Sequence, residues 1–573
     1  MNLTPNAITV LESRYLLRDA DGVLHETPEQ LFRRVANAIA MGEKKFGGDP
    51  LKYAEAFYEL MASLRFLPNS PTLMNAGLEK QQLSACFVLP VEDSLEGIFD
   101  TLKEAALIHQ SGGGTGFNFS KIRPKNDFIP ASGGTASGPV SFMELFDAST
   151  ERIKQGGKRR GANMGILNCD HPDVEEFISA KTDVNRLRNF NISVGVYDAF
   201  LDAVKKKAAW PLIHPNTRKT VREIPAVQLW DSIIDHAWRT GDPGLVFLDA
   251  LEKANPTPAQ GVINCTNPCG EVPLLPFEAC NLGSVNLSLF VISREGKPAI
   301  DIDALGETVM LAVRFLDNVV EQNQYILPQI EKTVRGNRKI GLGVMGWAEM
   351  LILLGIPYAS EEAIALGKKL MKFINEVAKE ASHALCAERG TFPEWIDSVY
   401  APAVPLRNAT RTAIAPTGTI GVIAGTSPSI EPLFALAFRR ENVLGHKTLV
   451  EENSVVTKLL GEKKLLSEHV LKKMRGEGHV ENTDLPAELK LLLKTAQHIG
   501  PHWHLAHQAA FQEFTDNAVS KTINLPNSAA REDIAQIYSK ARDLGLKGIT
   551  VFRDGCKPLQ VMNAGTSCEV CAT

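Results

Sequence analysis

The sequence has no long hydrophobic run. Its longest nearly apolar stretch is MLILLGIPYA at 350–359, far short of the ~18 residues that a membrane-spanning helix needs. The N-terminus, MNLTPNAITVLESRYLL, lacks the basic segment and the apolar segment that make up a secretory signal peptide. We therefore predict a cytoplasmic protein with no membrane partner.

The sequence also lacks a cluster of positive charge. The formal net charge is -5 and no long run of Lys or Arg occurs, so nothing indicates a nucleic-acid-binding surface. Lys and Glu are concentrated at 462–490, which predicts a solvated helical insertion. The charge pattern therefore predicts no nucleic-acid partner.

Cysteine is not arranged as in a secreted protein. The chain has nine cysteines in 573 residues, which do not form the dense disulfide framework of a small secreted domain. The Cys-x-x-Cys pair Cys568 and Cys571 lies in a C-terminal segment that we predict to be flexible, not beside a thioredoxin-like βαβ unit. Single cysteines are usually buried fillers, so a functional role needs support from neighbouring residues.

Helical and strand-like segments alternate along most of the chain. Residues 28–66 have helical spacing, and the strand-like runs LSACFVLPV, GANMGIL and FNISVGV are separated by the helical runs FMELFDASTERIK and PDVEEFISAK. Asp93 with Glu96 predicts a capping box, and Ser360 and Gly390 predict the two ends of a long helix. This alternation predicts an α/β fold with mainly parallel strands, and it leaves open whether the sheet is closed.

The segment NPCGE brings three chemically useful side chains together. Cys269 lies between Asn267 and Glu271. A carboxylate held near a thiol in an apolar loop is a candidate base with a raised pKa, and the Asn267 amide can hydrogen-bond a substrate hydroxyl. Cys269 can act as a nucleophile, a metal ligand or a radical carrier. Zinc is disfavoured, because no Cys or His pair with the usual ligand spacing lies nearby.

Two other cysteines follow small residues in strand-like runs. Cys86 lies in QLSACF and Cys280 in EACNLGSVNL, and each by itself is typical of a protein core. Together with Cys269 they suggest a site of three thiols, in which one carries the chemistry and two form a disulfide. The run APTGTIG adds small residues whose backbone N–H groups can cradle a phosphate, although no Walker lysine follows.

These motifs resemble the catalytic subunit of ribonucleotide reductase, in its adenosylcobalamin-dependent class II form. The resemblance covers most of residues 5–555. It rests on NSPTLMNAG, QLSACF, SGGGTGFNFSKIRP, QGGKRRGAN, NPCGE, EACNLGSVNL and APTGTIG, in the order of the family. It implies a ten-stranded α/β barrel, with two five-stranded parallel halves set antiparallel and NPCGE as a finger loop inside. It also implies a helical segment at 1–65, the barrel at 66–555 and a flexible tail at 556–573.

The resemblance implies a role for each residue of the thiol site. Cys269 would hold the transient thiyl radical that removes the 3′ hydrogen of the substrate ribose. Glu271 would take the proton of the 3′-hydroxyl, and Asn267 would hold the substrate hydroxyls. Cys86 and Cys280 would supply two electrons and close to a disulfide.

The resemblance also implies binding residues. The substrate would be contacted by Ser70, Ala85, Cys86, Gly114, Asn267, Gly270, Glu271, Pro416, Thr417, Gly418, Thr419 and Ile420. A deoxynucleotide effector would bind at a dimer interface and contact Asp147, Gln155, Lys158, Arg160 and Lys181. Some relatives have an aspartate at the position of Lys154, which leaves the ribose contact open. Cys568 and Cys571 would carry electrons from a thioredoxin-like reductant to the buried disulfide, and a zinc site or an accidental pair are the alternatives.

The radical source follows from what the late part of the sequence lacks. A class I subunit has a Tyr-Tyr pair in its late strand, where this chain has Thr550 and Val551, and a class III enzyme has a C-terminal glycyl-radical motif. Adenosylcobalamin remains as the cofactor, although the cobalamin signature D-x-H-x-x-G is absent and no contact residue can be named. No further metal site is implied. Without an ATP-cone segment or the insertion of monomeric relatives, we expect a homodimer that acts on ribonucleoside diphosphates.

Three other functions fit the sequence less well than a class II reductase. A class I large subunit is disfavoured by the missing tyrosines, and a non-catalytic nucleotide-binding homologue by the presence of Cys269 and Glu271. A thiol–disulfide oxidoreductase would place its Cys-x-x-Cys pair in a thioredoxin-like unit.

Overall fold

The computed structural model describes residues 1, 3–130, 133–155, 159–440, 449–557 and 562–564. Three N-terminal helices each begin at a proline that follows a capping side chain, because proline fits the first helical position and the capping oxygen accepts an N–H bond of the first turn. The caps are Thr4, Thr27 and Asp49. The helices are α1 (Pro5–Arg14), α2 (Pro28–Ala40) and α3 (Pro50–Ala62).

Five parallel strands form the first half of the main sheet. Each pairs with the next in the order β2, β3, β8, β9 and β12. Their bounds are β2 (Cys86–Val88), β3 (Gly114–Asn118), β8 (Asn163–Asn168), β9 (Phe190–Val196) and β12 (Gly244–Phe247). The helices between them are α5 (Leu95–Ser111), α6 (Pro139–Arg152), α7 (Val174–Ser179), α8 (Asp198–Lys206) and α9 (Ala226–Thr240).

The second half has the same number of parallel members. β15 pairs with β18, and β21 pairs with β22. The extended segment 410–414 lies between these two pairs. Its Thr412 forms a parallel bridge with Leu342 of β18, and its Ile414 forms one with Val519, just before β21. The strands are β15 (Ala279–Asn286), β18 (Ile340–Met345), β21 (Thr522–Leu525) and β22 (Gly548–Arg553). Antiparallel pairs β2–β15 and β12–β22 join the two halves at both edges. The strands therefore close on themselves, which confirms the predicted ten-stranded barrel of two antiparallel halves.

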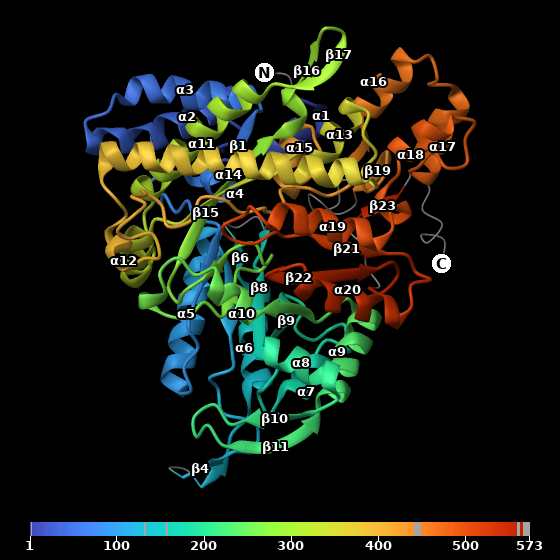
Figure 1. Ribbon diagram of the computed structural model, residues 1–573. Helices are drawn as coiled ribbons and strands as arrows, with labels where there is room; N and C mark the ends of the chain where they lie inside the picture. The colour runs from blue at the N-terminus through green and yellow to red at the C-terminus, as the bar shows by residue number, and fades with distance from the viewer. Residues whose placement is uncertain (2, 131–132, 156–158, 441–448, 558–561, 565–573) are drawn as a thin grey trace.

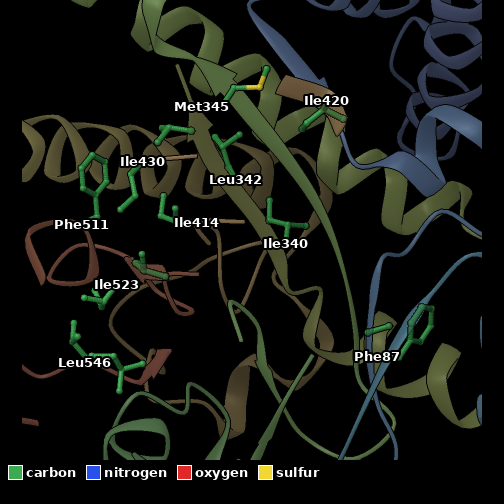
Figure 2. Packing of buried hydrophobic residues seen from close by; sticks show 14 of the residues in the cluster. Phe87, Ile340, Leu342, Met345, Ile414, Ile420, Ile430, Phe511, Ile523 and Leu546 are labelled. Carbon is green, nitrogen blue, oxygen red and sulfur yellow. The ribbon is translucent and has the colours of Figure 1, made fainter. Parts of the chain in front are cut away.

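Helices cover the barrel and bury its outer face. In Figure 1, α11 (Ile302–Gln322) and α14 (Glu361–Arg389) lie together above the strands and beside α2 and α3. The long helix α14 starts after Ser360 and ends before Gly390, as predicted. Figure 2 shows Ile340 and Leu342 of β18 in the same apolar cluster as Ile414 and Ile523, so the closing segment 410–414 shares the core of its neighbours.

Three local predictions differ from the structure. The N-cap of α5 is Ser94, whose side chain accepts from Gly97 N, and not Asp93, which instead pairs with Arg123. The run at 416–421 is a turn that enters helix α15 and not only a strand and a turn. Residues 462–490 are not solvated on every side, because their apolar residues form a cluster of their own against α13.

The remaining elements are short or peripheral. Among the described residues, no helix is long and apolar enough to cross a membrane. The remaining strands are β1 (Phe66–Pro68), β4 (Phe128–Ile129), β5 (Gly134–Thr135), β6 (Lys154–Gln155), β7 (Arg159–Arg160), β10 (Ala209–Ile213), β11 (Thr220–Pro225), β13 (Cys265–Thr266), β14 (Pro273–Leu274), β16 (Val291–Arg294), β17 (Lys297–Ile300), β19 (Ala437–Arg440), β20 (Leu449–Glu452) and β23 (Met562–Ala564). The remaining helices are α4 (Ser70–Asn75), α10 (Leu248–Lys253), α12 (Pro328–Asn337), α13 (Trp347–Leu354), α15 (Gly418–Ala424), α16 (Ser454–Glu462), α17 (Glu468–Glu477), α18 (Ala487–Leu492), α19 (Pro501–Gln512) and α20 (Arg531–Asp543), with 3-10 turns η1 (Met41–Phe46), η2 (Pro258–Gln260), η3 (Leu287–Phe290), η4 (Pro393–Asp397) and η5 (Ala496–His498).

Candidate active site

The segment that contains NPCGE is a hairpin loop inside the barrel. β13 and β14 pair antiparallel and leave residues 267–272 as the connecting loop. The side chain of Asn191 on β9 donates to the carbonyl oxygen of Pro268 at 2.8 Å and ties the loop to the first half of the barrel. A Cβ on Gly116 of β3 would lie 1.8 Å from the carbonyl oxygen of Thr266, so only glycine permits this approach. This is the predicted finger loop.

The loop presents Asn267 and Glu271 to Cys86. The Asn267 amide donates from Nδ2 to Cys86 Sγ at 3.1 Å, and the Cys86 thiol lies 3.9 Å from Glu271 Oε1. Val272 N donates to Asn267 Oδ1 at 3.0 Å, which fixes the orientation of the amide. Ala518 N donates to the carbonyl oxygen of Glu271 at 2.8 Å, so the second half of the barrel also holds the loop. Residues more than 180 positions apart thus form one hydrogen-bonded set.

Cys86 and Cys280 face each other across two neighbouring strands. They are direct partners in the antiparallel register of β2 with β15, and both are present as thiols. Opposed residues of such a pair have Cα atoms about 4.5–5.5 Å apart, which lies within the range that a disulfide spans. The register therefore permits a Cys86–Cys280 disulfide without rearrangement of the backbone.

Burial changes the acidity of the site. Glu271 is only 2% exposed, and burial raises its pKa to about 7 against the opposing hydrogen bonds of Asn267 and Cys86. Its Oε2 atom has no hydrogen-bond partner within the described part of the chain. Burial also raises the pKa of the Cys86 thiol, and the nearby Glu271 carboxyl adds to that rise. The pair therefore holds a carboxyl group that can exchange a proton near neutral pH and a thiol that stays protonated.

Cys269 differs from the other two thiols because its side chain is exposed. It lies on the turn in which Gly270 N donates to the carbonyl oxygen of Asn267 at 3.0 Å, and Gly270 has a positive φ of 83° that favours glycine. The turn places Cys269 at the wall of a cavity of about 550 Å³.

Most of the residues predicted to bind substrate line this cavity. The predicted residues in its wall are Ser70, Ala85, Cys86, Gly114, Asn267, Glu271, Pro416, Thr417, Gly418, Thr419 and Ile420. Gly270 and Cys280 are not part of that wall. The wall also includes residues that we did not predict, among them Asn69, Gly112, Ala162 and Ser284. All four lie in motifs quoted above: Asn69 in NSPTLMNAG, Gly112 in SGGGTGFNFSKIRP, Ala162 in QGGKRRGAN and Ser284 in EACNLGSVNL.

The predicted phosphate cradle is the start of α15. Thr417 adopts a left-handed backbone with φ 50° and precedes the first helical residue, Gly418. Its hydroxyl oxygen accepts from Ser429 N at 2.7 Å, which holds the turn. A Cβ on Gly418 would meet no atom within 4 Å, so the backbone at this wall of the cavity is open to a ligand.

The residues predicted to bind an effector are placed in two groups. Asp147 on α6 accepts from Asn189 N at 2.8 Å, and Lys181 donates to the carbonyl oxygen of Phe190 at 2.6 Å. Lys181 also pairs with Asp242 at 3.1 Å, so its charge is already balanced within the chain. Gln155 and Arg160 lie on the β6–β7 hairpin, and Lys158 lies outside the described residues. Cys568 and Cys571 also lie outside them.

Open space lies next to Cys269. A Cβ on Gly112, in the cavity wall, or on Gly270, which follows Cys269 in the chain, would meet no atom within 4 Å, and Cys269 itself is exposed. Small residues around an exposed thiol fit a bulky, mostly non-ionic cofactor that reacts at that thiol. No group of three or more His, Cys, Asp and Glu side chains in the described ranges is arranged to hold a metal ion.

Comparison with known proteins identifies related chains over the whole length. The family model "Ribonucleotide reductase, all-alpha domain" matches residues 1–81, and "Ribonucleotide reductase, barrel domain" matches 84–405 and 403–552. The chain is 49% identical to a vitamin B12-dependent ribonucleoside-diphosphate reductase of Thermoplasma acidophilum, covering 99% of this chain and 81% of that protein. It is 47% identical to the protein of that name from Mycobacterium tuberculosis H37Rv, covering 98% and 79%. The structure of an Actinobacillus ureae class Id ribonucleotide reductase alpha subunit superimposes with a TM-score of 0.79 at 26% identity, over 96% of this chain and 97% of that one.

Proposed function

The chain belongs to the ribonucleotide reductase family, and from that premise we propose that it reduces ribonucleoside diphosphates to 2′-deoxyribonucleotides with adenosylcobalamin as cofactor. One observation carries the proposal beyond the family: the finger loop brings Asn267 and Glu271 against Cys86, which is the register partner of Cys280, at a cavity that Cys269 also lines. The relatives named as vitamin B12-dependent support the choice of cofactor.

The proposed chemistry gives each of these groups its own role. Cys269, as a thiyl radical, removes the 3′ hydrogen and later returns it. Glu271 takes the proton of the 3′-hydroxyl, and the 2′-hydroxyl leaves as water after protonation by a thiol. Cys86 and Cys280 supply two electrons to the sugar and become a disulfide, so that electrons and protons balance. Asn267 holds the substrate hydroxyls and polarises the 3′-keto group.

The groups around the cavity support a phosphorylated substrate, and the names of the relatives support a diphosphate. The open backbone at Gly418 and the hydroxyl of Ser70 line the same cavity as the three catalytic side chains Asn267, Cys269 and Glu271. Backbone N–H groups at the start of α15 and at Ser70 would hold the phosphates, while the ribose lies over the finger loop.

The residues around Cys269 fit adenosylcobalamin. Gly112, Gly270 and the exposed Cys269 would lie against it. When bound, adenosylcobalamin supplies an organic radical by homolytic cleavage of its cobalt–carbon bond. The strand β22 has exposed Thr550 and buried Val551 where a class I subunit has two tyrosines, so the strand has no aromatic pair to relay a radical from a second subunit.

Product formation with the purified chain alone tests the proposal. We expect deoxyribonucleoside diphosphate from a ribonucleoside diphosphate, adenosylcobalamin and a dithiol, and none when the cobalamin is omitted. Activity that depends on a second protein subunit and not on cobalamin would favour the class I alternative. Binding of nucleotide without any turnover would favour a non-catalytic homologue.

The assembly and its partners are also proposals. α5 exposes Leu95, Phe99 and Leu107, with Phe99 53% exposed, and the adjoining α6 exposes Leu145. α5 lies at one side of the molecule in Figure 1, where these apolar side chains can meet a second copy. We propose a cytoplasmic homodimer with a deoxynucleotide effector beside α6 and a thioredoxin-like reductant that acts through Cys568 and Cys571. We also propose that the chain has three parts: a helical segment at 1–65, the barrel at 66–555 and a tail at 556–573.

A further inference from the structure

The two thiols of the proposed disulfide differ in access from the cavity. Both are buried, with Cys86 3% and Cys280 1% exposed, but Cys86 is part of the cavity wall and Cys280, on β15, is not. The side chain of Cys280 is packed against Gly341. A Cβ on Gly341 would lie 3.7 Å from Cys280 Sγ and only 2.4 Å from the side chain of Leu282, so little space is left there. A thiol that enters through the cavity therefore reaches Cys86 first.

A buried ion pair lies beside Cys280. Lys339 Nζ donates to Glu278 Oε2 at 2.6 Å, and both side chains are at most 2% exposed. Glu278 also accepts from Leu275 N at 2.7 Å and from Asn337 Nδ2 at 2.5 Å, so each of its oxygens has a donor. Burial of such a pair carries a desolvation cost. None of the proposed steps on the substrate uses it.

The thiol of Cys280 contacts the backbone of Lys339, one member of this pair. Its Sγ donates to the carbonyl oxygens of Asn281 at 3.3 Å and Lys339 at 3.7 Å. Burial raises the pKa of Cys280. The Lys339 ammonium opposes this rise and is the second-largest influence, and the Glu278 carboxylate adds to the rise by a smaller amount. Glu271, whose carboxyl group lies 3.9 Å from the sulfur of Cys86, acts with burial to raise the pKa of both thiols, whereas Lys339 opposes that rise at Cys280.

We propose that the Cys86–Cys280 disulfide is opened by attack of a dithiol that enters the cavity and reacts at Cys86, and that Cys280 leaves as a thiolate stabilised by Lys339, a positioning residue. The inference rests on the proposed function, which supplies the disulfide. Attack on a disulfide is faster when the departing sulfur is better stabilised as a thiolate. Carboxyl groups lie near both sulfurs, and Lys339 beside Cys280 is the cation that favours this one direction of opening.

The step balances as a thiol–disulfide exchange. A thiolate of the dithiol forms a bond to Cys86 Sγ, the Cys86–Cys280 bond breaks, and its electron pair goes to Cys280 Sγ. The second thiol of the reductant then attacks the mixed disulfide and releases Cys86. The reductant loses two electrons and two protons and becomes a disulfide, and Cys86 and Cys280 each regain a proton.

Mapping the first adduct on the unmodified chain tests the direction. Enzyme oxidised by a single turnover is mixed with 2-mercaptoethanol and an excess of an alkylating reagent, quenched in acid and digested for mass spectrometry. We expect the mercaptoethanol adduct on Cys86 and the alkyl group on Cys280, at least tenfold more often than the reverse. The reverse or an equal distribution would overturn the inference alone. Failure to form a Cys86–Cys280 disulfide would overturn the proposed redox chemistry as well.

Substitution of Lys339 tests its part separately. Lys339→Gln should slow two steps unequally. Reduction of the disulfide by 2-mercaptoethanol should be slowed about tenfold more than the first turnover of the reduced enzyme. Lys339→Arg should restore most of the rate of disulfide reduction. Lys521→Gln is the matched control, because Lys521 is also fully buried and paired, with Glu431, yet is not beside Cys280. Equal slowing of both steps in Lys339→Gln would show a merely structural role. If that variant does not fold, the adduct map on the unmodified chain still decides the direction.

Discussion

Cys269 and its two neighbouring thiols show how one residue type takes different tasks in one site. Cys269 is exposed, whereas Cys86 and Cys280 are buried and opposed in register. Exposure suits a thiol that must meet a cofactor and then the sugar. Burial suits a pair that must remain reduced until the substrate has reacted.

Replacement of Cys269 tests its proposed role as the hydrogen carrier. Cys269→Ser should give no detectable deoxynucleotide, while nucleotide binding and thermal stability stay unchanged, because a hydroxyl cannot readily replace a thiol in this hydrogen transfer. Product formation, isothermal nucleotide binding and melting temperature are the measurements. Cys386→Ser, at a partly exposed cysteine of α14, is the control and should keep full activity. Appreciable turnover by Cys269→Ser would exclude the role.

Glu271 links catalysis to stability through its raised pKa. The pKa of Glu271 is about 7 in the folded chain and has its ordinary lower value in the unfolded chain. At a pH between these two values, Glu271 is therefore protonated more often in the folded state than in the unfolded state. Stability from this group is therefore present at low pH and is lost as pH rises through about 7, a penalty of about 3 kcal/mol above that pH.

Glu271→Gln should remove that penalty. The variant should be more stable than the parent at pH 8 by up to about 3 kcal/mol and about equal to it at pH 4.5, as measured by denaturant unfolding. In the parent, the rate of the first turnover should rise with pH through about 7, because the ionised carboxylate is the base. A difference in stability that stays constant from pH 4.5 to pH 8 would contradict the raised pKa.

At the scale of elements, the finger loop depends on a close approach between β13 and β3. A Cβ on Gly116 would lie 1.8 Å from the carbonyl oxygen of Thr266, so Gly116→Ala must move the loop that carries Asn267 and Glu271. A displacement near 1 Å costs about 100-fold in rate, and we expect a loss of that order in kcat/KM. Gly461→Ala is the control, because a Cβ there meets no atom within 4 Å on α16. Full activity of Gly116→Ala would show that the loop position is not critical.

At the scale of the whole molecule, the apolar residues on α5 predict association of two copies. Phe99→Glu should convert a dimer to a monomer in sedimentation analysis, since loss of a central apolar anchor costs about 2 kcal/mol or more. Leu51→Glu on α3 is the control, because Leu51 is 83% exposed but lies on another part of the molecule. A Phe99→Glu protein that still forms dimers would place the interface elsewhere.

The proposed electron path also belongs to the whole molecule. Cys86 is 3% exposed and lies in the wall of the cavity, so a dithiol of the same chain is the proposed carrier between it and a reductant protein. Cys568→Ser with Cys571→Ser should slow multiple turnover with thioredoxin while the first turnover and turnover with a small dithiol are preserved. Normal multiple turnover with thioredoxin would exclude the tail as the carrier.

The sequence by itself determined the α/β class, the long helix between Ser360 and Gly390, and the three side chains of NPCGE, because these depend on local spacing, capping and residue type. The apolar loop indicated a raised pKa for Glu271, and the resemblance implied the barrel and the Cys86–Cys280 pair. Only the tertiary structure showed the register that opposes the two cysteines, the closure through 410–414 and the depth at which Glu271 is buried. Register, closure and depth of burial depend on contacts between residues far apart in the chain, so a local pattern does not determine them. The same reason hid the Lys339–Glu278 pair, whose members directly precede the paired strands β18 and β15 and lie 61 positions apart in the chain.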